Sequence, residues 1–178
     1  SCEAGPELLA GAWDPDRQAD ISRAFAATRL PYSKDTWVRV KTRLDEYSQA
    51  WIGAWGDACR EHASGGQVRR WLDLKLACLG RRKAHMTALV NVLAKADPAI
   101  VENAILAVAA LPSIASCDDS DVLLTAAVPP DDPTLATQVD ELRGQLARGA
   151  ALETTGKFAE GLEEVAGVRV AAEGLGFA

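Results

Sequence analysis

Apolar residues recur along most of the chain at steps of three and four, the spacing that places them on one side of an α-helix. The longest such pattern spans residues 33–62 and consists of Trp37, Val40, Leu44, Tyr47, Trp51, Trp55 and Ala58. A second pattern spans residues 67–96 and repeats about every seven residues, with Lys83 as its one polar member: Leu72, Leu76, Leu79, Met86, Val90 and Leu93. No stretch shows the alternation that is typical of a β-strand, so we predict an all-α fold.

Proline and glycine residues mark where the remaining helices begin and end. Asp14-Pro15 and Asp97-Pro98 each combine a good N-cap with a proline in the first turn, and they predict helices over residues 14–28 and 97–111. Further helices are expected over 120–127, 134–152 and 157–174. The two longest helices are predicted to run antiparallel, and each is about 45 Å long at 1.5 Å per residue.

A proline-rich segment divides the chain. Residues 128–133 contain three prolines, which cannot lie in the interior of a helix. We therefore predict an antiparallel helical array over residues 1–128, a joint over 129–133 and a helix pair over 134–178.

The charge is unevenly distributed. The chain carries a net charge of −6, with an excess of positive charge in residues 1–90 and a larger excess of negative charge in 91–178. The overall acidity argues against a nucleic-acid partner, whose phosphates would be repelled. We interpret the basic residues between 60 and 83 as a solvated helix face, with an anion-binding patch as the alternative: Arg60, Arg69, Arg70, Lys75, Arg81, Arg82 and Lys83.

The sequence lacks the residue patterns typical of enzymes. The two histidines have no metal-binding spacing, there is no nucleophile elbow, and Gly156-Lys157 lacks the remainder of a phosphate-binding loop. We expect no catalytic residue, no metal and no cofactor. A candidate ligand or partner groove is the face shared by Trp37, Trp51 and Trp55, although such a face more usually packs in the core between long helices. The concave face of the C-terminal helix pair is the alternative surface.

Four cysteines allow three pairings. Residues that are equally distant from the turn of a helical hairpin face each other. Cys78 and Cys117 are almost equidistant from the turn near Asp97, and Cys2 and Cys59 from the turn near Pro31. This favours disulfides Cys2–Cys59 and Cys78–Cys117, although four buried free thiols are the alternative. Disulfides would indicate an oxidising compartment.

The chain is expected to be part of a longer polypeptide. It begins with Ser1, and its one methionine, Met86, lies far from the start. The longest unbroken apolar run, Ala104–Leu111, has eight residues, whereas a membrane span needs about 20. Any contact with a membrane would therefore come through the parent chain.

Residues 2–130 contain landmarks in an order that resembles a known family. These are Cys2–Asp14 with its Trp13-Asp14, Leu30-Pro31-Tyr32, Trp37, Ala58-Cys59, Leu74–Arg82, Val101–Ala104, Leu111–Ser113 and Cys117. Together they resemble the helical region downstream of the kinase domain in large bacterial serine/threonine protein kinases of the myxobacterial type. In that family the region leads into tetratricopeptide repeats.

The tail resembles the middle of one tetratricopeptide unit. Ala151-Leu152, Gly156, Phe158, Ala159 and Gly161-Leu162 match the glycine and aromatic residue at the turn between paired helices, with a small residue three positions after the aromatic. Gly161 stands where alanine is usual. The expected fold is thus an antiparallel helical array that ends in a tetratricopeptide-like helix pair.

The resemblance implies a function without catalysis in this chain, because the kinase motifs of the family are not present in it. It implies a sensor or protein-interaction domain that binds a protein, a peptide or a small ligand and acts on an upstream kinase domain. Such kinases often have a transmembrane helix before this region, which implies the extracytoplasmic side of a single-pass membrane protein. The alternative is a cytoplasmic helical-repeat adaptor or scaffold of a non-kinase regulator.

Overall fold

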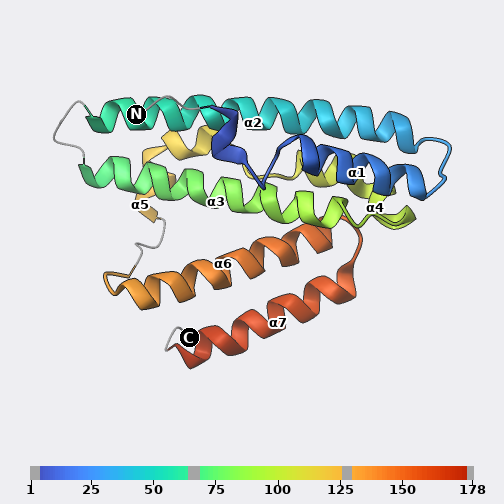
Figure 1. The fold of residues 1–178 in the computed structure, drawn as a ribbon. Coiled ribbons are helices and arrows are strands. Elements are labelled where there is room, and N and C mark those ends of the chain that lie inside the picture. The colour runs from blue at the N-terminus through green and yellow to red at the C-terminus, as the bar shows by residue number, and fades with distance from the viewer. Residues whose placement is uncertain (1–4, 64–68, 126–129, 176–178) are drawn as a thin grey trace.

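The computed structural model describes residues 5–63, 69–125 and 130–175, and every regular element in these ranges is a helix (Figure 1). The all-α prediction is therefore confirmed for this part of the chain. The elements are η1 (Pro6–Leu9), α1 (Pro15–Ala27), α2 (Ser33–Ala63), α3 (Arg69–Leu93), α4 (Pro98–Ala109), η2 (Ala115–Asp118), α5 (Ser120–Thr125), α6 (Pro133–Thr154) and α7 (Phe158–Gly174).

Helix α3 is the centre of the fold. It contacts α1, α2, α4, α5 and α6. The longest helices, α2 and α3, lie side by side, and α6 and α7 continue the array on the other side of α3 (Figure 1). Because α6 packs against α3 and α4, the C-terminal helix pair rests on the helices that precede it. The division of the chain into two regions with a joint at 129–133 stays a prediction.

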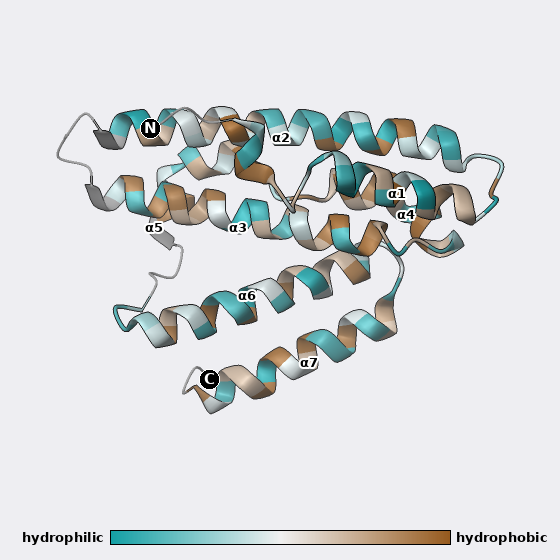
Figure 2. Cartoon of the chain, in the orientation of Figure 1, coloured by the Kyte–Doolittle hydropathy of each residue, from teal (hydrophilic) through white to brown (hydrophobic). Residues whose placement is uncertain are grey.

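Each helix of the array presents one apolar side to its neighbours. Hydrophobic and hydrophilic residues alternate around α2 and α3, as Figure 2 shows. The predicted stripe on α2 has Val40, Leu44, Trp51 and Ala58 fully buried, and that on α3 has Leu79, Met86, Val90 and Leu93 fully buried. Burial of these facing stripes removes apolar surface from water and accounts for the pairing of α2 with α3.

Three helices begin at an Asp-Pro pair. The side chains of Asp14, Asp97 and Asp132 accept hydrogen bonds from the backbone N–H three residues later, and the following proline occupies the first turn. Each carboxylate satisfies a backbone donor that has no partner inside the helix. The third pair places the start of α6 at Pro133, inside the segment that the sequence pattern assigned to the joint.

The turn between α6 and α7 depends on Gly156. Its φ is +84°, a left-handed conformation that glycine adopts without steric cost. The backbone N–H groups of Gly156 and Lys157 donate to the carbonyl oxygens of Glu153 and Leu152, which closes the end of α6. A turn therefore separates the two helices that were expected over 134–152 and 157–174.

Other boundaries differ slightly from the sequence pattern. Helix α3 ends at Leu93 rather than 96, and α4 ends at Ala109 rather than 111, because Asp97 and Pro112 begin new segments. The 3-10 turn η2 was not predicted; it contains Cys117, whose side chain faces α3. The expected end of α5 at residue 127 lies outside the described residues.

Candidate functional site

Trp51 and Trp55 form one aromatic pair on α2. Their rings stack with centroids 5.1 Å apart and an interplanar angle of 20°. Trp51 is only 2% exposed, and its Nε1–H donates to the carbonyl oxygen of Leu79 on α3 at 2.7 Å. Lys83, the polar residue in the apolar stripe of α3, lies with its Nζ 5.9 Å from the Trp51 ring centroid and makes a cation–π interaction with that ring.

Trp37 belongs to a different cluster nearer the start of α2. Its ring centroid lies 6.3 Å from that of Trp13 and 6.1 Å from that of Phe25 on α1. Trp37 therefore packs between α1 and α2, whereas Trp51 and Trp55 pack toward α3. None of the three tryptophans lines the hollows described below. Their proposed role as one groove wall stays a prediction.

The expected Cys78–Cys117 disulfide is present. It joins the middle of α3 to η2 across a sequence separation of 39 residues, with the two Cα atoms 5.7 Å apart. Both residues are 1% exposed. Disulfides form and persist in oxidising environments, so this bond is a first indication of the compartment.

Cys59 on α2 is also disulfide-bonded rather than a free thiol. Cys2, the partner expected from the sequence, lies outside the described residues. The Cys2–Cys59 pairing therefore stays a prediction.

The interpretation of the basic residues as one solvated face is wrong for Lys75. Its side chain is buried, and its Nζ lies 2.5 Å from a carboxylate oxygen of Asp118 in η2 and 4.0 Å from one of Glu61 on α2. Arg82 is also engaged, donating to Ser113 O at 3.1 Å and to Ser116 Oγ at 2.9 Å. These cations fasten the segment after α4 to α3.

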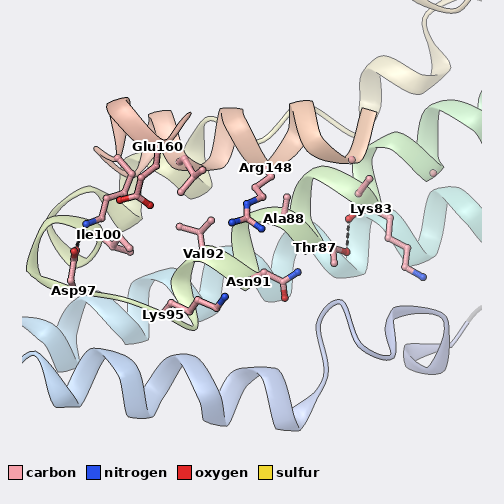
Figure 3. Close-up of a pocket in the computed structure, with 15 residues that line it drawn as sticks. Lys83, Thr87, Ala88, Asn91, Val92, Lys95, Asp97, Ile100, Arg148 and Glu160 are labelled. Atoms are coloured by element: carbon pink, nitrogen blue, oxygen red, sulfur yellow. Dashed lines mark hydrogen bonds and ion pairs between the residues drawn. The ribbon is translucent and has the colours of Figure 1, made fainter. Parts of the chain in front are cut away.

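A groove runs between α3 and α6 and holds a hollow of about 620 Å³ (Figure 3). We call it the α3–α6 groove. Small and apolar residues from both helices line its floor, whereas its polar side is formed by a row at four-residue spacing on α3. The first group is Gly80, Ala84, Ala88 and Val92 with Gly144 and Leu152, and the second is Lys83, Thr87, Asn91 and Lys95.

Two glycines of the groove lining face open space. A Cβ atom added at Gly80 or at Gly144 would meet no other atom within 4 Å. The two helices therefore do not close on each other at these positions, and open space is left between them. A volume of this size lies within the range of about 300–1,000 Å³ that is typical of small-ligand pockets.

One end of the groove is closed by an ion pair between Lys157 and Asp97. The Lys157 ammonium donates to the Asp97 carboxylate, which also caps α4. Burial alone would raise the pKa of Asp97, but the hydrogen bonds from Lys157 and from the Ile100 N–H outweigh it and hold that pKa below its usual value. The same hydrogen bond raises the pKa of Lys157. Both groups are thus held in their charged forms.

A second hollow of about 720 Å³ adjoins the groove on the side of α1. The two hollows share Asn91, Lys95 and Arg148. Together they are lined by more cations than carboxylates: Arg17, Arg23, Lys83, Lys95, Arg148 and Lys157 against Asp20, Asp97 and Glu160. This surface is locally positive on a chain whose net charge is −6, and such a field attracts anions.

A third hollow, of about 430 Å³, has the opposite character. It lies between η1, α1 and α2 and carries the carboxylates of Glu7, Asp14 and Asp45. Asp45 accepts from Trp13 Nε1 at 2.9 Å, and backbone bonds from Arg17 and Gly11 lower the pKa of Asp14. Asp14 and Asp45 thus hold the chain around Trp13 in place. Because these two carboxylates are already engaged, the α3–α6 groove is the stronger candidate site.

The amino-acid pattern alone does not single out the groove residues, for a specific reason. The polar row on α3 has a visible spacing of four residues. However, Lys95 and Arg148 are far apart in the sequence, and the apolar pattern did not predict that their helices, α3 and α6, are in contact. The sequence held one signal of open space between two helices. This signal was the row of small residues Gly80, Ala84 and Ala88 on α3 together with Gly144 on α6.

No known protein family, curated protein or solved structure is detectably similar to this chain. Within the described ranges, no helix is both long and apolar enough to cross a membrane. In the same ranges, no group of three or more histidine, cysteine or acidic side chains could hold a metal ion.

Proposed function

We propose that this chain is a non-catalytic sensor domain of a bacterial serine/threonine protein kinase, and that it binds its ligand in the α3–α6 groove. The observation that carries the proposal is the groove itself, a hollow of about 620 Å³ in whose lining Gly80 and Gly144 face open space. The resemblance of residues 2–130 to the region downstream of such kinase domains supplies the context. In this account the domain regulates an upstream kinase domain of the same chain.

The position of the groove suits it to a sensor. Its two sides come from α3, the central helix, and from α6, which carries α7. A ligand between them would contact both α3 and α6. It would stabilise the relative position of the two helices that it binds best over other relative positions. Such a change is one way in which binding could reach a kinase domain elsewhere in the chain.

The disulfide supports an extracytoplasmic location for the domain. Cys78–Cys117 joins α3 to η2 covalently, and such bonds are rare in proteins of the reducing cytoplasm. On this basis we propose that the domain lies on the outer side of the membrane that its parent kinase would span.

The C-terminal helix pair is proposed to be tetratricopeptide-like. Gly156 and Phe158 stand at its turn, and Gly149 on α6 lies against Gly161 on α7. One such pair buries few apolar residues by itself: Phe158, Leu162, Val165 and Val170 of α7 are all exposed. This exposed side favours the second candidate function, a helical-repeat adaptor or scaffold of a non-kinase regulator in the cytoplasm.

The test of the proposed function uses the whole parent chain. Gly144→Leu places a large side chain in the groove, and Gly53→Leu, at a helical glycine that also faces open space, is the matched control. We expect Gly144→Leu to change the rate of autophosphorylation and Gly53→Leu to leave it unchanged. A parent sequence without a kinase domain, or equal rates for both variants, would reject the kinase sensor and favour the adaptor.

A further inference from the structure

Three side chains line both the α3–α6 groove and the second hollow that adjoins it. Asn91 and Lys95 lie one helical turn apart on α3, and Arg148 extends toward them from α6 (Figure 3). All three are hydrogen-bond donors through an amide, an ammonium and a guanidinium group. Together they present two positive charges and a neutral donor to one region of the groove.

These donors are available to a ligand. The Lys95 ammonium has no hydrogen-bond or ion-pair partner among the residues that the structure describes, although its backbone N–H donates to Val92 O. Arg148 lies 3.4 Å from a Glu164 carboxylate oxygen, but its side chain remains 60% exposed. An exposed pair of this kind is held weakly, so an incoming anion can exchange with Glu164.

The other cations of the groove are already engaged. Lys83 Nζ donates to the carbonyl oxygen of Leu8 at 2.6 Å and lies over the Trp51 ring, and Lys157 is paired with Asp97. These two lysines hold η1 and α7 against the array. The charge that remains for binding is therefore concentrated at Lys95 and Arg148.

The floor of the groove suits a different part of the same ligand. Ala88 and Val92 on α3 and Leu152 on α6 offer apolar surface next to the three donors, and Gly144 leaves space above it. A ligand that fits both parts has an apolar body and one anionic head.

We propose that the α3–α6 groove binds a small amphipathic organic anion, whose head is held by Lys95, Arg148 and Asn91 and whose body lies on the apolar floor. This inference rests on the proposed function and names the chemical class of the ligand. The volume of about 620 Å³ favours a small molecule over a protein segment, since it falls in the range of small-ligand pockets.

Two fluorescent probes with the same aromatic body test the proposal. Anilinonaphthalene sulfonate carries one sulfonate, and phenylnaphthylamine lacks it. Both are titrated into the wild-type chain and into Lys95→Gln and Arg148→Gln. We expect each substitution to weaken the binding of the sulfonate probe by about tenfold, as for the loss of a charge-assisted hydrogen bond, and to leave the neutral probe unchanged.

Matched controls remove cations that lie outside the groove. Arg143→Gln on α6 and Lys41→Gln on α2 each break a pair with a nearby aspartate, Asp140 and Asp45 respectively. Neither is expected to change the binding of either probe. Melting followed by circular dichroism shows whether each variant keeps its fold.

The outcomes separate this inference from the proposed function. Selective weakening of the sulfonate probe by Lys95→Gln and Arg148→Gln supports the anion site. If both probes bind and only a groove-filling Gly144→Leu weakens them, the anion site is wrong and the groove remains a ligand site. If neither probe binds the wild-type chain, both the anion site and the ligand groove are rejected.

Discussion

Gly149 on α6 and Gly161 on α7 lie directly against each other. A Cβ atom at Gly161 would come within 3.1 Å of the Gly149 carbonyl oxygen and 3.3 Å of the Glu153 nitrogen. A Cβ atom at Gly149 would lie 2.9 Å from Val165 Cγ2. The two helices can approach this closely only because neither residue has a side chain.

Gly161→Val should therefore separate α6 from α7. The added side chain meets backbone atoms that cannot move aside easily, and we expect a loss of about 1–3 kcal/mol in the free energy of unfolding. The matched control is Gly167→Val, also on α7, where an added Cβ meets nothing within 4 Å. Urea denaturation of both variants tests this, and equal midpoints would contradict the close packing.

Trp51→Phe should destabilise the fold rather than affect a surface. The substitution removes the hydrogen bond from Trp51 Nε1 to Leu79 O and leaves space in the contact between α2 and α3. We expect a loss of about 1–3 kcal/mol. Trp55→Phe is the control, because Trp55 is only partly buried and keeps a stacked partner. An unchanged stability of Trp51→Phe would instead favour its role in a groove wall.

The contribution of the Lys157–Asp97 pair to stability should depend on pH. The pKa of Asp97 is lowered in the folded state, so its contribution is present above its unfolded pKa of about 4 and is lost as the pH falls through the folded value. The pKa of Lys157 is raised, so its contribution is present below its unfolded pKa of about 10.4 and is lost as the pH rises further.

Asp97→Asn isolates this pair because asparagine keeps the cap on the Ile100 N–H. Its urea midpoint should fall below that of the wild type between these two pKa values, and the difference should shrink under acidic conditions. Asp132→Asn makes the same change in the cap of α6 and should show a smaller pH dependence. A difference that stays constant down to low pH would show that the charge of Asp97 is not involved.

The Cys78–Cys117 bond should contribute strongly to stability. It closes a long loop, and the chain-entropy estimate for a loop of this length is about 4 kcal/mol. The double variant Cys78→Ala/Cys117→Ala should lose about this amount in urea denaturation. Mass spectrometry of the native protein under non-reducing conditions should recover the two segments as one linked peptide. Separate peptides with free thiols would contradict the bond.

The helices were predictable because their signals are local. Asp-Pro pairs begin α1 and α4, Gly156 ends α6, and the stripes on α2 and α3 follow from the helical period. The Cys78–Cys117 bond was also predictable, because residues that are equally distant from the turn of a helical hairpin face each other. The burial of Lys75 was not predictable. It depends on the ion pair with Asp118, which is distant in the sequence and does not enter a local pattern.

The candidate site was the least predictable feature. Its charged residues, Lys95 and Arg148, belong to helices whose contact is set by packing between distant segments. The tryptophans were the visible signal, and they form two separate clusters around the core helices. Open space between helices is a property of the assembled fold, and the residue pattern of one helix does not predict it.

The most direct test of the central claim, that the α3–α6 groove is a ligand site, is a titration of Gly144→Leu with anilinonaphthalene sulfonate and phenylnaphthylamine. The leucine occupies the open space above the floor while it improves helix propensity, so the fold should stay stable. We predict that both probes bind at least about tenfold more weakly than to the wild type, or about 1.4 kcal/mol, and that Gly53→Leu binds both normally. Unchanged binding of both probes to Gly144→Leu would contradict the account.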